Sequence, residues 1–364
     1  MAAVGYTSGL LPRLTRAGEW FLHSGIQEPN GGVARYYGAD AGRNRAVSTE
    51  ITGYAASAYV YLHSLTRDPR YLEAALRAAR FLSRTAWNAE ACAMPFEMDP
   101  PALAYFFDCG IVVRGLLAVW RGTGEEEFLE AGRRLGRAMA RDFVSPEGCH
   151  PVLALPDKRP LERDAARWSR SSGCYQLKAA MAWWDLWEAT GEAEFREPYQ
   201  RVLDESMWTW EEFLPGHPDR LKVADRLHAF LYFLEGLLPV AQKARCAKVF
   251  YNGIRAVERQ VDRIGTEFER ADVYAQLLRI RLYADWAGAV PLDQFTAINE
   301  ANRLAEFQAS AEDPRIDGGY YFGRRAGEWA PHVSPVSTAF AMQALALWDT
   351  LGSGNAQPHR HLLI

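Results

Sequence analysis

The stretches LTRDPRYLEAA (65–75), GTGEEEFLEAG (122–132) and ATGEAEFREPY (189–199) decide the fold, because one pattern occurs in all three. The second residue of each stretch is a threonine that opens a turn, and successive threonines are 57 and 67 residues apart. Each turn leads into a charged, amphipathic segment that carries an aromatic residue at the same offset. A helical hairpin that recurs about every 50 to 70 residues is typical of a closed or stacked array of helix pairs.

Apolar residues recur with helical spacing along the whole chain, and almost no stretch alternates as a strand does. The expected helices are 11–24, 49–65, 69–85, 107–121, 125–141, 171–189, 193–212, 225–239, 242–262, 270–287, 291–310 and 336–351. The second, fourth, sixth, eighth, tenth and twelfth are apolar nearly all round, and a helix without a polar face must be buried. Six inner and six outer helices in alternation predict an all-α (α/α)6 barrel, a six-hairpin toroid, as one domain over 1–352 with a flexible tail at 353–364.

Composition excludes several classes of protein. Hydrophobic residues make up 49% and charged residues 24%, as in ordinary globular domains. The formal charge of -4 provides no basic field for nucleic acid. The N-terminal stretch lacks the apolar core of a signal peptide, and no apolar run reaches the length of a membrane helix. We therefore expect a cytoplasmic protein that binds neither nucleic acid nor membrane, and the oligomeric state stays open.

Five scattered cysteines do not form the framework of a disulfide-stabilised protein. Cys109 and Cys174 begin inner helices and Cys149 precedes His150, so three thiols and an imidazole could in principle bind zinc. However, the chain has no C-x-x-C or H-x-x-H spacing, and small buried thiols are common. It also lacks a dinucleotide fingerprint, a Walker loop and a nucleophile elbow. We expect neither a metal nor a cofactor.

All long connections precede inner helices, so they gather at one end of the predicted ring, where a site is expected. The residues that we expect to bind substrate there are Tyr54, Arg114, Trp168, Arg170, Gln176, Tyr232, Asp272, Gln276, Arg279, Tyr321 and Trp329. Aromatic rings mixed with Arg, Asp and His suit carbohydrate, because sugar C–H faces stack on rings and hydroxyls need donors and acceptors. The alternative is that these aromatic residues only fill a large barrel.

Carboxyl groups at the starts of inner helices are candidates for catalysis. Hydrolysis of a glycosidic bond usually needs one protonated and one ionised carboxyl group, and Glu50, Asp108 and Asp225 are placed to supply them. The alternative is that these acids only cap their helices, a role that Asp fills well.

His228 and His332 indicate a second chemistry. Two imidazoles on opposite sides of a cavity can move a proton off and back onto a sugar carbon, as in epimerisation. The alternative for either histidine is a hydrogen-bonded imidazole in the core.

With these hairpins in place, residues 20–350 resemble the six-hairpin glycosidase-like superfamily. The segment FFDCGIVVRGLL is similar to the D-x-G segment of unsaturated glucuronyl hydrolases, which implies a catalytic role for Asp108 and carries over Gly110. Those enzymes use a second Asp on the next inner helix, and here Asp185 lies near the far end of that helix instead.

Two further segments resemble other barrels. ADRLHAFLYFLEGLL is similar to a His- and Glu-bearing helix of N-acylglucosamine 2-epimerases, which implies roles for His228 and Glu235. IDGGYYFGR with STAFAMQALAL is similar to repeats of terpenoid cyclase and prenyltransferase barrels, but the aspartate-rich motif is absent. The function that the sequence favours most is therefore that of a glycoside hydrolase acting on a uronic-acid-containing or other oligosaccharide. A sugar epimerase or isomerase, and a non-catalytic saccharide- or partner-binding toroid, are the alternatives.

Overall fold

The computed structural model describes residues 10–99, 102–146, 148–164, 167–213, 219–265, 267–353 and 359–364. The α-helices of these residues are α1 (Leu10–His23), α2 (Thr49–Thr66), α3 (Pro69–Arg80), α4 (Phe106–Thr123), α5 (Glu126–Asp142), α6 (Gln176–Thr190), α7 (Arg196–Phe213), α8 (Arg220–Gly236), α9 (Ala244–Ile264), α10 (Ala271–Trp286), α11 (Gln294–Ala305) and α12 (Pro335–Ser353). The twelve expected helices are all present. An all-α architecture is confirmed.

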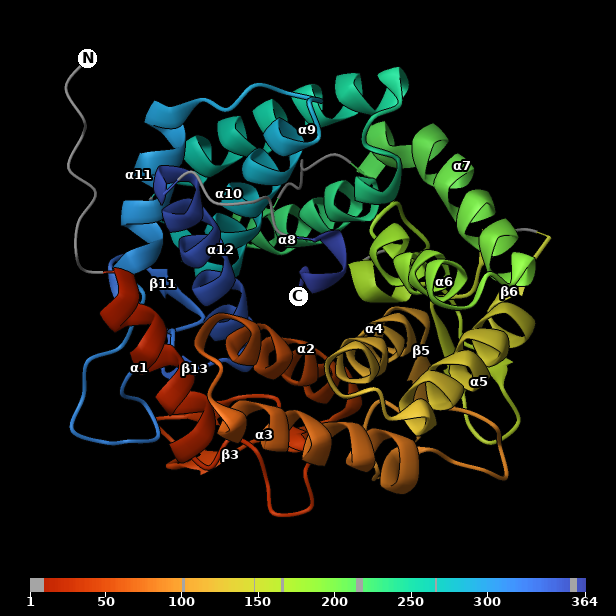
Figure 1. The fold of residues 1–364 in the computed structure, drawn as a ribbon. Coiled ribbons are helices and arrows are strands. Elements are labelled where there is room, and N and C mark those ends of the chain that lie inside the picture. Colours follow the sequence, from red (N-terminus) through yellow and green to blue (C-terminus); the bar gives the residue numbers. More distant parts are fainter. Residues whose placement is uncertain are drawn as a thin grey trace.

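The even-numbered helices form a closed inner ring. Each packs against the next even-numbered helix, and α12 returns to pack against α2. The odd-numbered helices surround this ring, as Figure 1 shows. This arrangement is the predicted (α/α)6 barrel.

Small residues let the inner helices approach closely. A Cβ atom at Gly115 of α4 would lie 2.5 Å from the carbonyl oxygen of Gly53 on α2. A Cβ atom at Gly110 would lie 2.5 Å from the Cα atom of Ala179 on α6. Neither contact leaves room for a side chain. Gly110, which sequence resemblance linked to a catalytic segment, is therefore required by packing alone.

Several helix boundaries differ from expectation by three to five residues, and α11 is shorter at both ends than the expected 291–310. α6 begins at Gln176 rather than 171, because Trp168–Arg170 form a separate 3-10 turn, η2. α8 begins at Arg220 rather than 225, since its first turn is polar and does not show apolar periodicity. α3 ends at Arg80 and continues as a π-helical turn, η1 (Phe81–Ala86). The remaining 3-10 turns are η3 (Ala193–Phe195), η4 (Leu238–Val240) and η5 (Arg360–Leu362).

The loops before the inner helices contain short β-strands. Sequence periodicity did not reveal these strands, because two or three residues are too few to show alternation. They are β1 (Val33–Ala34), β2 (Tyr37–Gly38), β3 (Arg43–Asn44), β4 (Val47–Ser48), β5 (Leu103–Tyr105), β6 (Val144–Ser145), β7 (Gly148–Cys149), β8 (Val152–Ala154), β9 (Arg159–Pro160), β10 (Phe268–Arg270), β11 (Gly323–Arg325), β12 (Glu328–Trp329) and β13 (His332–Val333). The antiparallel pairing of β13 with β2 joins the loops of the last and first inner helices.

The end of the chain lies inside the ring, where we had expected a loose tail. Residues 354–358 lie outside the described residues, but Leu363 and Ile364 are each 1% exposed. Figure 1 shows the C-terminal end at the centre of the ring. In the described part of the chain, no helix is long and apolar enough to cross a membrane.

Candidate active site

A cavity of about 510 Å³ opens at the end of the ring that carries the long loops. We call it the main cavity. The five residues predicted to be catalytic all line it, and they are Glu50, Asp108, Asp225, His228 and His332. They come from α2, α4, α8 and β13. The structure therefore brings together residues that lie up to 282 positions apart in the sequence.

Glu50 and Asp108 form an interacting pair of carboxyl groups. Burial raises the pKa of Glu50 to about 7. Burial, and then the charge of Glu50, raises the pKa of Asp108 well above its usual value, while Arg35 lowers both. The Oδ2 atom of Asp108 is buried and has no hydrogen-bond partner among the described residues. One carboxyl group of this pair can thus hold a proton near neutral pH.

Neither acid caps its helix. Ser48 is the N-cap of α2, and its hydroxyl accepts a hydrogen bond from the backbone N–H of Ile51. The N-cap position of α4 is Tyr105, which makes no side-chain capping bond. The capping explanation therefore does not account for Glu50 or Asp108.

Partners at Nδ1 hold the imidazole ring of His228 in one orientation. Its Nδ1 lies 2.6 Å from Oε1 of Gln276 and 3.4 Å from Oδ2 of Asp272. Since both neighbours are hydrogen-bond acceptors, the proton of the neutral ring belongs on Nδ1. Burial lowers the pKa of His228, against the charge of Asp272. Nε2 therefore carries a free lone pair at neutral pH and is the ring nitrogen available to act as a base.

Arg270 fixes the acids beside His228. Its Nε donates to Asp272 Oδ1 at 2.9 Å, and its Nη1 pairs with Asp225. Although burial opposes the shift, Arg270 lowers the pKa of Asp272, which is therefore ionised. The guanidinium group also lies over the ring of Phe322, 4.5 Å from its centroid.

His332 enters the cavity from β13. Its ring stacks on Phe322, with centroids 4.8 Å apart, and contacts Tyr36 at 4.6 Å. Burial lowers the pKa of His332. Two mainly neutral imidazoles thus line the same cavity from different elements.

An aromatic layer lies below these groups. The Tyr232 and Phe107 centroids are 4.6 Å apart, and the Tyr54 ring meets Phe340 edge-on at 5.3 Å. We call Tyr54, Phe107, Tyr232 and Phe340 the aromatic floor. Of the expected substrate-binding residues, Trp168, Tyr232 and Asp272 line the cavity, while Tyr54 and Gln276 do not line it.

Other expected substrate-binding residues lie elsewhere. Gln176 is buried, and its Oε1 accepts a long hydrogen bond from the backbone N–H of Gly173. Tyr321 and Trp329 stack on each other at 5.2 Å, and neither lines the main cavity. Arg170 does not line it either.

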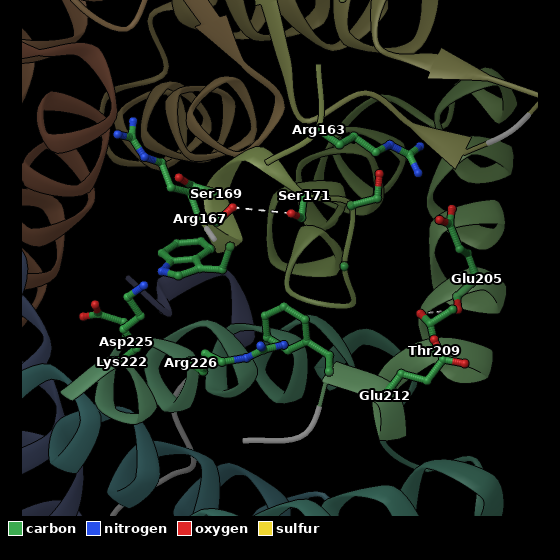
Figure 2. Close-up of a pocket in the computed structure, with 14 residues that line it drawn as sticks. Arg163, Arg167, Ser169, Ser171, Glu205, Thr209, Glu212, Lys222, Asp225 and Arg226 are labelled. Atoms are coloured by element: carbon green, nitrogen blue, oxygen red, sulfur yellow. Dashed lines mark hydrogen bonds between the residues drawn. The ribbon is translucent and has the colours of Figure 1, made fainter. Parts of the chain in front are cut away.

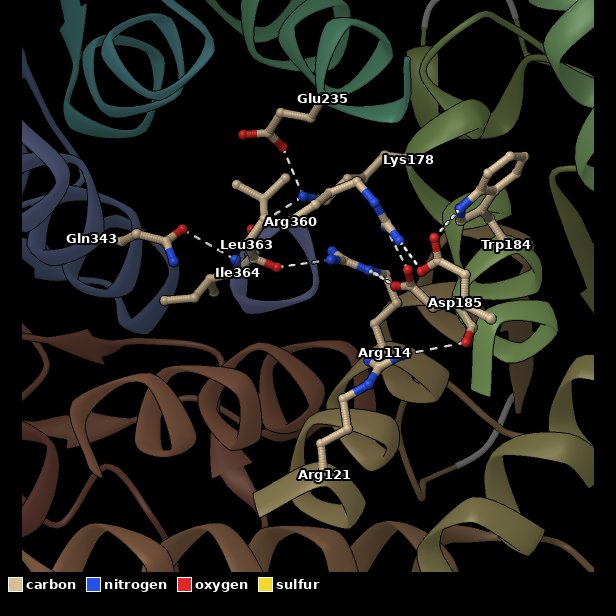
Figure 3. Close-up of polar contacts among 11 residues, drawn as sticks. Arg114, Arg121, Lys178, Trp184, Asp185, Glu235, Gln343, Arg360, Leu363 and Ile364 are labelled. Atoms are coloured by element: carbon tan, nitrogen blue, oxygen red, sulfur yellow. Dashed lines mark hydrogen bonds and ion pairs between the residues drawn. The ribbon is translucent and has the colours of Figure 1, made fainter. Parts of the chain in front are cut away.

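Arg114 and Arg279 belong to a buried charged network deeper in the ring, shown in Figure 3 for Arg114 and its neighbours. Arg114 binds Asp185 at 2.9 Å, and its Nη2 donates to the carbonyl oxygen of Leu363. Lys178 binds Glu235 at 2.8 Å, and Glu235 also pairs with Arg279. Burial lowers the pKa of Lys178 to about 7. These cations are occupied by protein groups, so we do not propose them as substrate-binding residues.

Sequence reasoning missed Arg35 and Arg270. Both line the main cavity, and Arg35 lies between β1 and β2 while Arg270 is the last residue of β10. Arg270 directly precedes the helix that carries Asp272, so a search that included the residue before each inner helix would have found it. Among the described residues, no group of three His, Cys, Asp or Glu side chains is arranged to hold a metal ion.

No protein-family model matches the chain, and no curated protein does. A sugar epimerase from a ruminal bacterium has a similar structure, with a TM-score of 0.71 and 12% identity over 93% of this chain and 98% of that one. A D-mannose isomerase has a TM-score of 0.72 and 9% identity over 96% and 100% of the two chains. An α-amylase from Clostridium perfringens has a TM-score of 0.61 and 10% identity over 92% and 98%. The chain therefore shares the (α/α)6 fold of these carbohydrate-active enzymes, and this is the fold that the sequence predicted.

Proposed function

We propose that this protein is a sugar isomerase or epimerase that moves a proton on the carbon next to the carbonyl group of a reducing sugar. The observation that carries this proposal is the environment of His228. Two acceptors behind Nδ1, together with a lowered pKa, leave Nε2 as a free base in the main cavity. A general base must be unprotonated and within reach of the proton that it takes.

The groups around the cavity can balance such a reaction. His228 Nε2 takes the proton from the carbon, and the electrons of the broken C–H bond form a C=C bond. The carbonyl oxygen then takes a proton from the Glu50 and Asp108 pair, whose raised pKa values keep one proton available. The result is an enediol, and Arg35 is the cation beside the pair that stabilises negative charge as it develops.

The site of proton return decides the product. When the His228 imidazolium gives its proton to the neighbouring carbon, the former carbonyl carbon, and the carboxyl pair recovers its proton from the other oxygen, an aldose becomes a ketose. When His332 in its protonated form delivers a proton to the opposite face of the carbon that lost its proton, the enediol hydroxyl on the former carbonyl carbon returns its proton to the carboxyl pair. The carbonyl group then re-forms, and the carbon that lost its proton is inverted. Because burial lowers the pKa of His332, the second route should become slower as the pH rises.

Incubation of reducing sugars in D2O tests the proposal. We expect a new sugar to form and deuterium to appear on the carbon next to the carbonyl group. The His228→Gln variant should lose about 10²- to 10⁴-fold in rate, the usual contribution of a general base. If neither deuterium nor a new sugar appears with hexoses or reducing disaccharides, the proposal is wrong.

Glycoside hydrolysis is the second candidate, and the carboxyl pair favours it. A protonated Asp108 could donate to the glycosidic oxygen, and Asp225 could take a proton from the attacking water. Asp225 is paired with Arg270, and this ion pair makes it less free than His228 to act as a base. Release of reducing ends from an oligosaccharide panel, abolished by Asp108→Asn without a change in melting temperature, would favour hydrolysis over isomerisation.

A further inference from the structure

A second cavity of about 620 Å³ adjoins the main cavity, and the proposed reaction does not use it. We call it the side pocket. It lies between Arg163 and residues 167–173, the C-terminal half of α7 and the beginning of α8, and Figure 2 shows the residues that line it. Trp168, Ser169 and Asp225 line both cavities, so the two are continuous around Trp168.

Four basic side chains line the side pocket, and they are Arg163, Arg167, Lys222 and Arg226. Arg167 has an acid partner, Asp164, at 3.6 Å. Within the described residues, none of the other three is in an ion pair. The Arg226 guanidinium lies over the ring of Phe213, 5.0 Å from its centroid, and its buried Nε has no hydrogen-bond partner in the described structure. An unpaired donor in a partly buried place is costly unless a ligand satisfies it.

The acids of the side pocket do not cancel this charge. Asp225 is already paired with Arg270. Glu205 and Glu212 lie on α7 rather than on α8, and burial raises the pKa of Glu205 while Arg163 lowers it. Asp219 directly precedes α8, and the first turn of α8 contains no acidic residue, while Lys222 and Arg226 are neighbours one helical turn apart. The α8 side of the pocket is therefore its electropositive side.

The spacing along α8 relates this charge to the reaction. Lys222 precedes His228 by six residues on the same helix. At 1.5 Å per residue, this spacing corresponds to a rise of roughly 9 Å along the helix axis. Trp168 lines both cavities, and the centroid of its ring lies 6.4 Å from that of the His228 ring. A negative group at Lys222 would therefore belong to the sugar unit beside the reacting one, and that unit would pass along the Trp168 ring.

We propose that the side pocket binds the negative group, a carboxylate or a phosphate, of the sugar unit that is glycosidically linked to the reacting sugar. The substrate is then an acidic disaccharide or a longer oligosaccharide with a free reducing end. The identity of the reacting end rests on the proposed isomerase or epimerase function. Binding of the negative group does not depend on turnover, so the two proposals can fail separately.

The test compares three reducing disaccharides of the same linkage: a neutral one, one with a uronic acid at the non-reducing end, and one with a 6-phosphate there. Dissociation constants are measured by calorimetry, and KM and kcat wherever turnover occurs. The variants are Lys222→Glu and Arg226→Gln. The control is Lys248→Glu, which makes the same charge change at an exposed position on the outer helix α9.

We expect at least one acidic disaccharide to bind more tightly than the neutral one, and the better of the two identifies carboxylate or phosphate as the group. Lys222→Glu should weaken that binding about tenfold, equivalent to about 1.4 kcal/mol, and should change neutral-sugar binding less than twofold. Lys248→Glu should change neither. The side-pocket proposal is wrong if Lys222→Glu weakens the binding of neutral and acidic disaccharides equally, or if the wild type shows no preference for an acidic disaccharide. Selective binding of an acidic disaccharide without any turnover supports the side-pocket proposal and counts against the isomerase or epimerase proposal.

Discussion

Replacing Gln276 with Glu tests the role of His228 with a change of very few atoms. Gln276 is fully buried, and its Oε1 lies 2.6 Å from Nδ1 of His228. A carboxylate in this position keeps the acceptor in place and adds a negative charge behind the imidazole. That charge stabilises the imidazolium, so the pKa of His228 should rise from its lowered value.

The contact distance sets the scale of this shift. With about 4 Å between the centres of charge and an effective dielectric constant of about 20, the attraction is about 4 kcal/mol, or about 3 pKa units. Burial of the new carboxylate opposes part of this gain, and we expect a rise of about 1 to 2 units, within the usual range for a neighbouring opposite charge. Because only the neutral ring can accept a proton, the variant needs a higher pH to become active.

The assay is the pH profile of kcat/KM for the reducing sugar that the wild type converts, from about pH 5 to pH 9. The acidic limb of the Gln276→Glu profile should move to higher pH, with activity recovering near pH 9. Gln276→Met, which removes the acceptor without adding charge, should lower activity without moving that limb upward. If the limbs of Gln276→Glu and the wild type coincide while the melting temperatures agree, His228 is not the base.

Three further predictions concern the framework. Asp185→Asn leaves the buried Arg114 without an anion and leaves Arg360 with Glu188 alone, so it should lower the free energy of unfolding by about 3 to 5 kcal/mol. Glu188→Gln, at a more exposed site, should cost under about 1 kcal/mol. Urea denaturation at pH 7 measures both. Although burial opposes it, the arginines lower the pKa of Asp185, so its contribution is fully present above the unfolded pKa of about 4 and should decrease progressively as the pH falls below that value. Gly110→Ala should lower the melting temperature, because its Cβ would press on the Ala179 backbone, and an unchanged melting temperature would contradict that packing. Removal of residues 359–364 should lower the melting temperature and leave KM unchanged, and a raised KM would contradict a purely structural role.

The fold could be predicted from the sequence because the hairpin repeat and the alternation of amphipathic and wholly apolar helices are local patterns. The same alternation located the main cavity, since Glu50, Asp108 and Asp272 all lie in the first turn of an inner helix. The short strands could not be predicted. Their pairing depends on contacts such as that between Tyr37 and Val333, which are almost 300 residues apart.

Depth along the inner helices could not be predicted from periodicity alone. Asp272, Gln276 and Arg279 share one face of α10, and the sequence assigned all three to the cavity. In the structure Asp272 lines the cavity, Gln276 positions His228, and Arg279 pairs with Glu235. A helical face predicts the direction of a side chain but not which group from another part of the chain will meet it.

The two polar regions inside the ring are separated by the aromatic floor, and this separation explains why similar residues have different roles. The Arg279 guanidinium lies 4.0 Å from the centroid of Phe340, and Arg279 does not line the main cavity. Arg114, Lys178 and Arg279 are matched by two acids and by backbone carbonyl groups of residues 363 and 364. The charges of these groups are matched by protein partners, and the unmatched Nε of Arg279 belongs to a residue that does not line the main cavity. The unpaired Oδ2 of Asp108 belongs to a residue that does. An unmatched polar atom facing a cavity, rather than a polar residue on an inner helix, is therefore the better indicator of function in this barrel.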